Sequence, residues 1–334
     1  MKFPASPDWI PMRFFWQHGR PFVDWCYLGR RRFTEPFFDF TLQQCMWMPF
    51  PLLFRPRTPV EALLEWQQAR PGLPPAGFVF HMSRCGSTLV SQMLAALSQN
   101  IVISEASPID SILRATRAVP GVDAAQQIAW LRALVSAWGQ RRYPDERHLF
   151  IKFDCQHLLE LPLLRAAFPQ TPWIFLYRDP VEVMVALMKL RGHLEPTLVD
   201  GVSFGIDRAE AMRMPPEEYV ARVLACILQT AIDHQSVAGG MLVNYRQLPQ
   251  AVTTSIAAHF GMSWTATETE IMHRAANFDA KNPVLHFTAD QQTKQRSVTE
   301  AIATASQRWL APLYERLEAL RLAAEEKCSH HAPP

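Results

Sequence analysis

Short apolar runs alternate with amphipathic stretches along most of the chain. Five of these runs have the length of buried strands, and they are 78–80, 101–103, 149–153, 173–177 and 241–245. Stretches with apolar residues at helical spacing separate them. Strands that alternate with helices favour a parallel sheet that is covered on both faces. The pattern therefore predicts a three-layer α/β domain with a short parallel sheet flanked by helices.

The amphipathic stretches predict helices that each bury one face. We expect helices over 87–97, 108–119, 123–139, 180–191, 215–238, 249–260 and 297–323, and one that ends near 168. Residues 192–214 predict a long loop. Ligands of such sheets bind beyond the carboxyl ends of the strands, so the residues that follow the strands are the candidates for chemistry.

The first 75 residues differ from the rest because they are rich in proline, phenylalanine and tryptophan. Proline at this density disfavours long helices. Large aromatic side chains gain most from burial, which disfavours a disordered tail. We expect an irregular arm over 1–75, ending in a helix at 59–70, that packs on a main domain of residues 76–325. A flexible tail would follow at 326–334, and the arm would either cap the site or shape an acceptor pocket.

Composition narrows the class of partner. The formal net charge is +2, so the chain has no overall field for nucleic acid or an acidic membrane. No apolar run approaches the roughly 20 residues that cross a bilayer, and the first residues lack the apolar core of a signal peptide. Six cysteines without C-x-x-C spacing indicate free thiols. We expect a cytoplasmic protein without a metal site, whose anionic ligand is held by local arginines.

The turn after the first sheet strand has the composition of an anion site. Residues 84–89 read Arg-Cys-Gly-Ser-Thr-Leu, and the next helix begins at Ser87. The first N–H groups of a helix lack intrahelical partners and point into such a turn, where Gly86 allows close approach of a ligand. Ser87 and Thr88 add hydroxyls, and Arg84 adds a planar fork of donors. The unit is P-loop-like, but it is no Walker A loop because no lysine precedes Ser87.

A second turn places an arginine directly after the strand over 173–177. Asp179 and Pro180 follow Arg178, with Asp179 as the expected helix N-cap and Glu182 completing a capping box. An arginine in such a strand-to-helix turn can also be an ordinary surface residue. Its position beyond a strand end makes it a candidate for a second anion contact.

Both turns resemble motifs of the sulfotransferases that use 3′-phosphoadenosine-5′-phosphosulfate (PAPS). The residues Arg84–Leu89 match the loop that binds the 5′-phosphosulfate, with Cys85 in place of a small residue. Arg178 matches the arginine that holds the 3′-phosphate in this family. Sulfotransferases usually have a serine eight residues later, and here that position is Ala186. The resemblance covers about residues 76–320.

Further segments add to the resemblance. The segment Val243–Leu248 is similar to one found late in the family domain, and we assign it no chemistry. Arg296 and Ser297 resemble the basic, serine-bearing loop that closes over the nucleotide. The resemblance therefore implies that Arg84, Cys85, Gly86, Ser87, Thr88, Arg178, Arg296 and Ser297 bind PAPS.

The catalytic positions are most similar to those of the tyrosylprotein branch of the family. Glu105 follows the second sheet strand, where this branch has its catalytic glutamate, and a carboxylate with a raised pKa can take the proton of an attacking hydroxyl. Lys152 ends the third strand and would neutralise charge on the transferring sulfuryl group, together with Arg84. His81 and His193 are alternative bases. Glu105 could instead stabilise the next helix dipole, and Lys152 could reach solvent.

The sequence thus predicts sulfuryl transfer from PAPS to a hydroxyl of unspecified type. A kinase of small molecules is the alternative enzyme, although it would require magnesium and usually a P-loop lysine. A non-catalytic nucleotide-binding module, whose aromatic arm recruits a partner, is the third possibility. The oligomeric state stays open.

Overall fold

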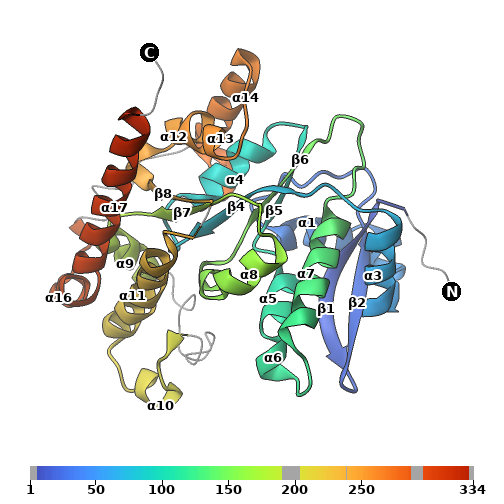
Figure 1. The fold of residues 1–334 in the computed structure, drawn as a ribbon, viewed down its shortest axis with the longest axis horizontal. Helices are drawn as coiled ribbons and strands as arrows, with labels where there is room; N and C mark the ends of the chain where they lie inside the picture. The colour runs from blue at the N-terminus through green and yellow to red at the C-terminus, as the bar shows by residue number, and fades with distance from the viewer. Residues whose placement is uncertain (1–5, 190–203, 238, 287–295, 331–334) are drawn as a thin grey trace.

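A five-stranded parallel sheet lies at the centre of the molecule, with helices packed around it (Figure 1). The computed structural model describes residues 6–189, 204–237, 239–286 and 296–330. The predicted α/β architecture is confirmed. No helix in these four ranges has both the length and the apolar character needed to cross a membrane.

All five predicted strands form, and their spatial order is β5-β6-β4-β7-β8. Their bounds are β4 Pro75–His81, β5 Asn100–Ser104, β6 His148–Lys152, β7 Trp173–Tyr177 and β8 Gly240–Asn244. The pairing is parallel throughout and aligns Ser104 with Lys152 and Tyr177 with Asn244. The carboxyl ends of the strands therefore meet at one edge, and the segments that follow them share that edge.

Helices follow the strands much as the pattern predicts. Their bounds are α4 Ser87–Ala95, α5 Ser107–Leu113, α6 Ala115–Ala118, α7 Ala124–Trp138, α8 Leu161–Ala167, α9 Pro180–Lys189, α10 Arg208–Ala211, α11 Pro216–His234, α12 Gln250–Thr253, α13 Ser255–His259, α14 Ala266–Ala276, α16 Glu300–Trp309 and α17 Ala311–His330, with short 3₁₀ helices η1 Cys155–Glu160 and η3 Tyr245–Gln247. Three expected helices are each broken in two, and α10 lies inside the expected loop. The terminal helix continues to His330, past the residue where we expected a tail to begin.

Helix α14 was not expected from the sequence, although a local signal for it exists. Thr265 Oγ1 accepts from the Glu268 backbone N–H at 3.2 Å, and Glu268 Oε2 accepts from the Thr265 N–H at 2.7 Å. This reciprocal capping box fixes the beginning of the helix. A short hairpin follows α14, formed by β9 (Phe278–Asp279) and β10 (Asn282–His286).

The expectation of an irregular amino-terminal arm is wrong in one respect, because its strands form an antiparallel sheet. The strands of the sheet are β1 Trp9–Gln17, β2 Arg20–Tyr27 and β3 Arg57–Pro59. Between β2 and β3 the chain forms the helices α1 Phe38–Met46 and α2 Pro49–Leu53, and α3 Val60–Ala69 follows β3. His18 and Gly19, at φ 51° and 72°, form the two-residue turn between β1 and β2. Pro11 lies at a register shift and Pro21 near the beginning of β2, where prolines fit a sheet.

The arm shares a hydrophobic core with the main domain through α7. The Trp138 indole N–H donates to the Pro11 carbonyl at 3.0 Å, and its ring lies 5.3 Å from the ring of Phe38. The ring of Phe14 lies 5.6 Å from that of Trp130. These aromatic side chains come from segments more than 90 residues apart and are buried together. The arm and the α/β domain are thus packed as one body.

This packing predicts that the arm unfolds together with the domain. Phe38→Ala removes a ring that is 1% exposed and should lower the free energy of unfolding by about 3 kcal/mol or more. Phe40→Ala is the control on the same helix, because that ring is 44% exposed and its loss should cost about 1 kcal/mol or less. Urea unfolding followed by far-ultraviolet circular dichroism measures both. Equal, small effects would mean that the arm folds apart from the domain.

Candidate active site

The turn between β4 and α4 is wound so that its backbone can surround an anion. Ser83, Arg84 and Gly86 have φ angles of 76°, 49° and 88°, all in the left-handed region. Left-handed residues next to right-handed ones turn successive N–H groups toward one point, and strain of this kind is common at ligand sites. A Cβ on Gly86 would lie 2.8 Å from the ring of Tyr245 and 2.9 Å from Leu248. Only glycine therefore fits there.

Cys85 turns its side chain away from this turn. Its thiol donates to the Leu176 carbonyl at 3.1 Å and is fully buried. Burial raises the pKa of Cys85 to about 12, so the thiol stays protonated at neutral pH. Cys85 can face a ligand only through its backbone.

Glu105 and Lys152 form a buried ion pair at the carboxyl edge of β5 and β6. Glu105 Oε1 contacts Lys152 Nζ, which is 1% exposed and also lies 3.4 Å from Thr88 Oγ1. The Glu105 backbone N–H donates to the Lys152 carbonyl at 2.8 Å, and Glu105 adopts a left-handed φ of 51°. The fold thus holds both predicted catalytic side chains against the beginning of α4. Lys152 does not reach solvent.

The pKa of Glu105 is lowered, whereas the role of a base led us to expect a raised pKa. Burial by itself would raise the pKa of this carboxyl. The Lys152 ammonium and His81 outweigh burial, and together they hold the pKa of Glu105 well below its usual range. Glu105 is therefore an ionised carboxylate that is paired with Lys152.

One ring nitrogen of His81, the alternative base, is engaged by a hydrogen bond. Nδ1 accepts from the Ser83 backbone N–H at 3.0 Å, and Nε2 lies 3.3 Å from Glu105 Oε1 without a hydrogen bond. A neutral ring with this contact at Nδ1 carries its proton on Nε2. In that tautomer His81 has no free lone pair for a substrate. His193 lies outside the described residues.

Two residues that the sequence did not suggest also border this pair. The Phe37 ring centre lies 5.0 Å from Lys152 Nζ and 5.5 Å from Lys281 Nζ. Phe37 comes from the amino-terminal arm and Lys281 from the turn between β9 and β10. No periodic pattern could have indicated either. The Asp279-x-Lys281-Asn282 turn signal was the one available hint for the hairpin.

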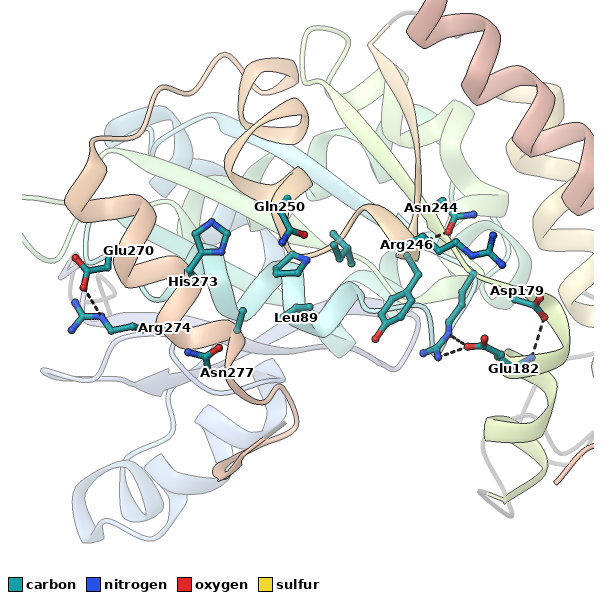
Figure 2. Close-up of a pocket in the computed structure, with 15 residues that line it drawn as sticks. Leu89, Asp179, Glu182, Asn244, Arg246, Gln250, Glu270, His273, Arg274 and Asn277 are labelled. Carbon is teal, nitrogen blue, oxygen red and sulfur yellow. Dashed lines mark hydrogen bonds and ion pairs between the residues drawn. The ribbon is translucent and has the colours of Figure 1, made fainter. Parts of the chain in front are cut away.

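Arg178 is buried directly after β7, beside a pocket of about 680 Å³ (Figure 2). Its guanidinium forms an ion pair with Glu182 and lies 4.0 Å from the centre of the Tyr245 ring. Asp179 caps α9 as expected, accepting from the Val181 N–H at 2.9 Å. The predicted capping box is incomplete, however, because Glu182 is engaged by Arg178.

The pocket brings together four segments that are distant in sequence (Figure 2). Residues of α4, the beginning of α9, the segment after β8 and α14 line it, and they include Leu89, Arg178, Asp179, Glu182, Asn244, Tyr245, Arg246, Leu248, Pro249, Gln250, Glu270, His273, Arg274 and Asn277. The Tyr245 ring lies close to both Gly86 and the Arg178 guanidinium. The two predicted anion sites are therefore neighbours along one edge of the sheet.

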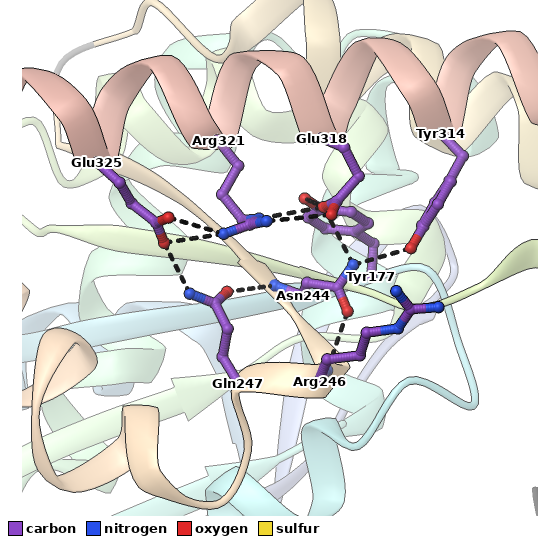
Figure 3. A network of polar contacts seen from close by, with 8 residues as sticks. All are labelled: Tyr177, Asn244, Arg246, Gln247, Tyr314, Glu318, Arg321 and Glu325. Atoms are coloured by element: carbon purple, nitrogen blue, oxygen red, sulfur yellow. Dashed lines mark hydrogen bonds and ion pairs between the residues drawn. The ribbon is translucent and has the colours of Figure 1, made fainter.

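A polar network anchors this edge to the terminal helix (Figure 3). Glu318 of α17 accepts from the Tyr177 hydroxyl and from Asn244 Nδ2, the latter at 3.0 Å. Arg321 donates to Glu318 at 3.1 Å and to Glu325 at 2.9 Å. Burial and the neighbouring carboxylate raise the pKa of Tyr177, so its hydroxyl remains a donor. The ends of β7 and β8, which precede Arg178 and Tyr245, are held in place.

The remaining predicted positions lie apart from these contacts. Ala186 is buried on α9 and offers no hydroxyl. Arg296 is exposed and Ser297 is partly buried, directly before α16. α16 packs on α9, α11 and α17. Their role in nucleotide binding stays a prediction.

Comparison with known proteins identifies the family. A family model described as "Sulfotransferase family" matches residues 75–266, which is more than half of the chain. No curated protein sequence matches significantly. Similar solved structures include a sulfotransferase from Alicyclobacillus acidocaldarius, with 16% sequence identity over 74% of this chain and 96% of that chain and a TM-score of 0.41. A sulfotransferase from Mycobacterium avium has 14% identity over 73% of this chain and 81% of that chain, with a TM-score of 0.43. A mouse sulfotransferase, solved in complex with adenosine 3′,5′-bisphosphate (PAP), has 13% identity over 81% of this chain and 94% of that chain, with a TM-score of 0.41. The chain belongs to the sulfotransferase family and is an enzyme of that family.

Proposed function

We propose that this enzyme transfers a sulfuryl group from PAPS to an acceptor hydroxyl and releases adenosine 3′,5′-bisphosphate (PAP). The observation that carries the proposal is that two groups of cationic and hydrogen-bonding residues lie close to the same ring, that of Tyr245. One consists of the turn at Arg84–Thr88 with Lys152, and the other is Arg178 in its pocket. A nucleotide with phosphates at both ends of its ribose matches two such neighbouring sites.

The 5′-phosphosulfate would bind at the turn, and the adenosine would occupy the pocket. Arg84, Ser87, Thr88 and the first N–H groups of α4 supply donors for the phosphosulfate. Cys85 would contribute its backbone alone. Leu89 and the apolar residues after β8 offer surface to the adenine base. Arg296 and Ser297 are proposed to close over the nucleotide.

The 3′-phosphate would bind Arg178. Glu182 orients this guanidinium and offsets part of its charge. Ala186 cannot donate to the phosphate, and Arg246, which lines the same pocket, is the residue that could supply the missing contact. The departure from the family pattern at Ala186 would then be compensated inside the pocket.

The transfer would proceed by in-line displacement. The acceptor oxygen bonds to sulfur while the bond from sulfur to the bridging oxygen breaks, and its electron pair passes to the 5′-phosphate. Arg84 and Lys152 stabilise the charge that develops there. As Lys152 turns to the donor, its hold on Glu105 weakens, and burial then raises the pKa of this carboxyl. Glu105 thereby becomes the base that takes the acceptor proton, in the manner of the tyrosylprotein branch.

The acceptor would approach past the amino-terminal arm, because Phe37 borders Lys152. A phenol, sugar, lipid or peptide hydroxyl fits this chemistry equally. We also propose a cytoplasmic location, supported by the free thiols of Cys26, Cys45, Cys85 and Cys155.

Arg178→Ala tests the nucleotide assignment. The affinity for PAP should fall by about tenfold or more, because a charged hydrogen-bonding partner of the 3′-phosphate is lost. Adenosine 5′-phosphate, which lacks the 3′-phosphate, should bind the variant and the wild type almost equally. Isothermal titration calorimetry without magnesium measures both ligands. An equal loss for the two would remove Arg178 from this role, and a wild type that responds to ATP with magnesium and never to PAP would favour a kinase.

Glu105→Gln tests the base. Turnover of labelled PAPS, measured with a panel of hydroxyl acceptors, should fall by about 10²-fold or more while PAP affinity is nearly kept. Wild-type turnover in this variant would assign the proton transfer to another group, such as His193.

A double variant separates catalysis from stability at the same pair. Glu105→Gln leaves a buried ammonium uncompensated and should cost about 3 kcal/mol of unfolding free energy. Adding Lys152→Met removes that charge and should restore part of the stability without restoring turnover. If turnover returned together with stability, neither Glu105 nor Lys152 would be catalytic.

A further inference from the structure

The turn between β9 and β10 contains Lys281, which has no role in the reaction proposed above. Asp279 Oδ1 accepts from the backbone N–H groups of Lys281 and Asn282 at 2.9 and 2.8 Å. These two hydrogen bonds fix the turn and occupy the Asp279 carboxylate. Lys281 is therefore presented from a defined backbone position.

The Lys281 ammonium lies close to the catalytic ion pair. Its Nζ is 5.5 Å from the centre of the Phe37 ring, and Lys152 Nζ is 5.0 Å from the same centre. An aromatic ring attracts cations to its face, so the Phe37 ring favours both ammonium groups in their positions. Phe37 is part of the arm, whereas both lysines belong to the α/β domain.

Two cations and two carboxylates surround Lys281. Arg84 and Lys152 face it from the turn after β4 and from the end of β6, and the carboxylates nearby are Glu105 and Asp279. Glu105 is committed to Lys152, and Asp279 to the turn amides. Lys281 is exposed at the surface, yet partial desolvation and the two cations lower its pKa to about 8. Three cations and two carboxylates leave a net positive charge here, which an anion bound between the cations would offset.

We propose that Lys281 binds the 5′-phosphosulfate of PAPS, and the 5′-phosphate of PAP, alongside Arg84 and Lys152. This inference rests on the proposed function, and it adds a cation from the β9–β10 turn to the donor site. Lys281 would hold the phosphate that becomes more negative as the bond to sulfur breaks.

The proposal has a consequence that a structural role for Lys281 would not have. A bound anion favours the protonated ammonium and so raises the pKa of Lys281 above its value of about 8 in the free protein. Near pH 8.5 the free lysine is largely neutral, and binding would then take up part of a proton. At pH 7 the lysine is already protonated and no proton is taken up. The phosphates of PAP are fully ionised at pH 8.5 and do not interfere.

The experiment titrates the full chain with PAP by calorimetry at pH 7.0 and 8.5, each in two buffers of different ionisation enthalpy. The wild type should take up a fraction of a proton at pH 8.5 and almost none at pH 7.0. Lys281→Met should bind about tenfold more weakly at pH 7.0 and take up none. Lys281→Arg should bind well at both pH values without proton uptake. Lys189→Met, at the exposed end of α9, is the control for a lost positive charge and should behave as the wild type.

Different results would contradict the role of Lys281 and the proposed sulfuryl transfer from PAPS. The same PAP affinity in Lys281→Met as in the wild type, or the same proton uptake in Lys281→Arg as in the wild type, would overturn the role of Lys281 and leave the sulfotransferase proposal standing. A wild type that does not bind PAP at all would overturn both.

Discussion

The ion pair between Glu105 and Lys152 is the contact on which the rest of the site depends. An ammonium that is 1% exposed must be neutralised inside the protein, because transfer of a lone charge from water costs several kcal/mol. The register of β5 and β6 aligns Ser104 with Lys152, so Glu105 begins beside its partner. Lys152 also reaches Thr88 at the beginning of α4. One buried charge thus joins two strands to the anion-binding turn.

The same principle explains how cations can lie at this edge of the sheet. Lys152 is paired with Glu105, and Arg178 with Glu182. Each carboxylate stabilises its cation, and in the proposed reaction a phosphate or sulfuryl oxygen would displace it. Lys281 differs because the one carboxylate in its own turn is engaged by backbone amides. Desolvation and the neighbouring cations lower the pKa of Lys281 to about 8, so its charge changes near that pH.

The parts of the site that the sequence predicted are those carried by contiguous residues. Arg84–Thr88 could be proposed as site residues because the turn, the helix start and the donors lie within five positions, and Arg178 because it directly follows a strand. Lys281 and Phe37 could not, since their proximity to Lys152 arises from packing between distant segments. The predicted direction of the Glu105 pKa shift was wrong for the same reason, because a lysine 47 residues away lowers this pKa. In the arm, the number of prolines obscured a hairpin whose prolines occupy positions that a sheet tolerates.

The arm also shows how folding and site assembly are coupled. Phe37 and Phe38 are adjacent, yet Phe37 contacts the lysines whereas Phe38 packs against Trp138 in the shared core. Burial of Phe38 therefore determines where the neighbouring ring can lie. Phe37 borders both Lys152 and Lys281, and this contact forms only when the arm is docked on α7. The contacts that join the arm to the fold thus also bring it beside the proposed active site.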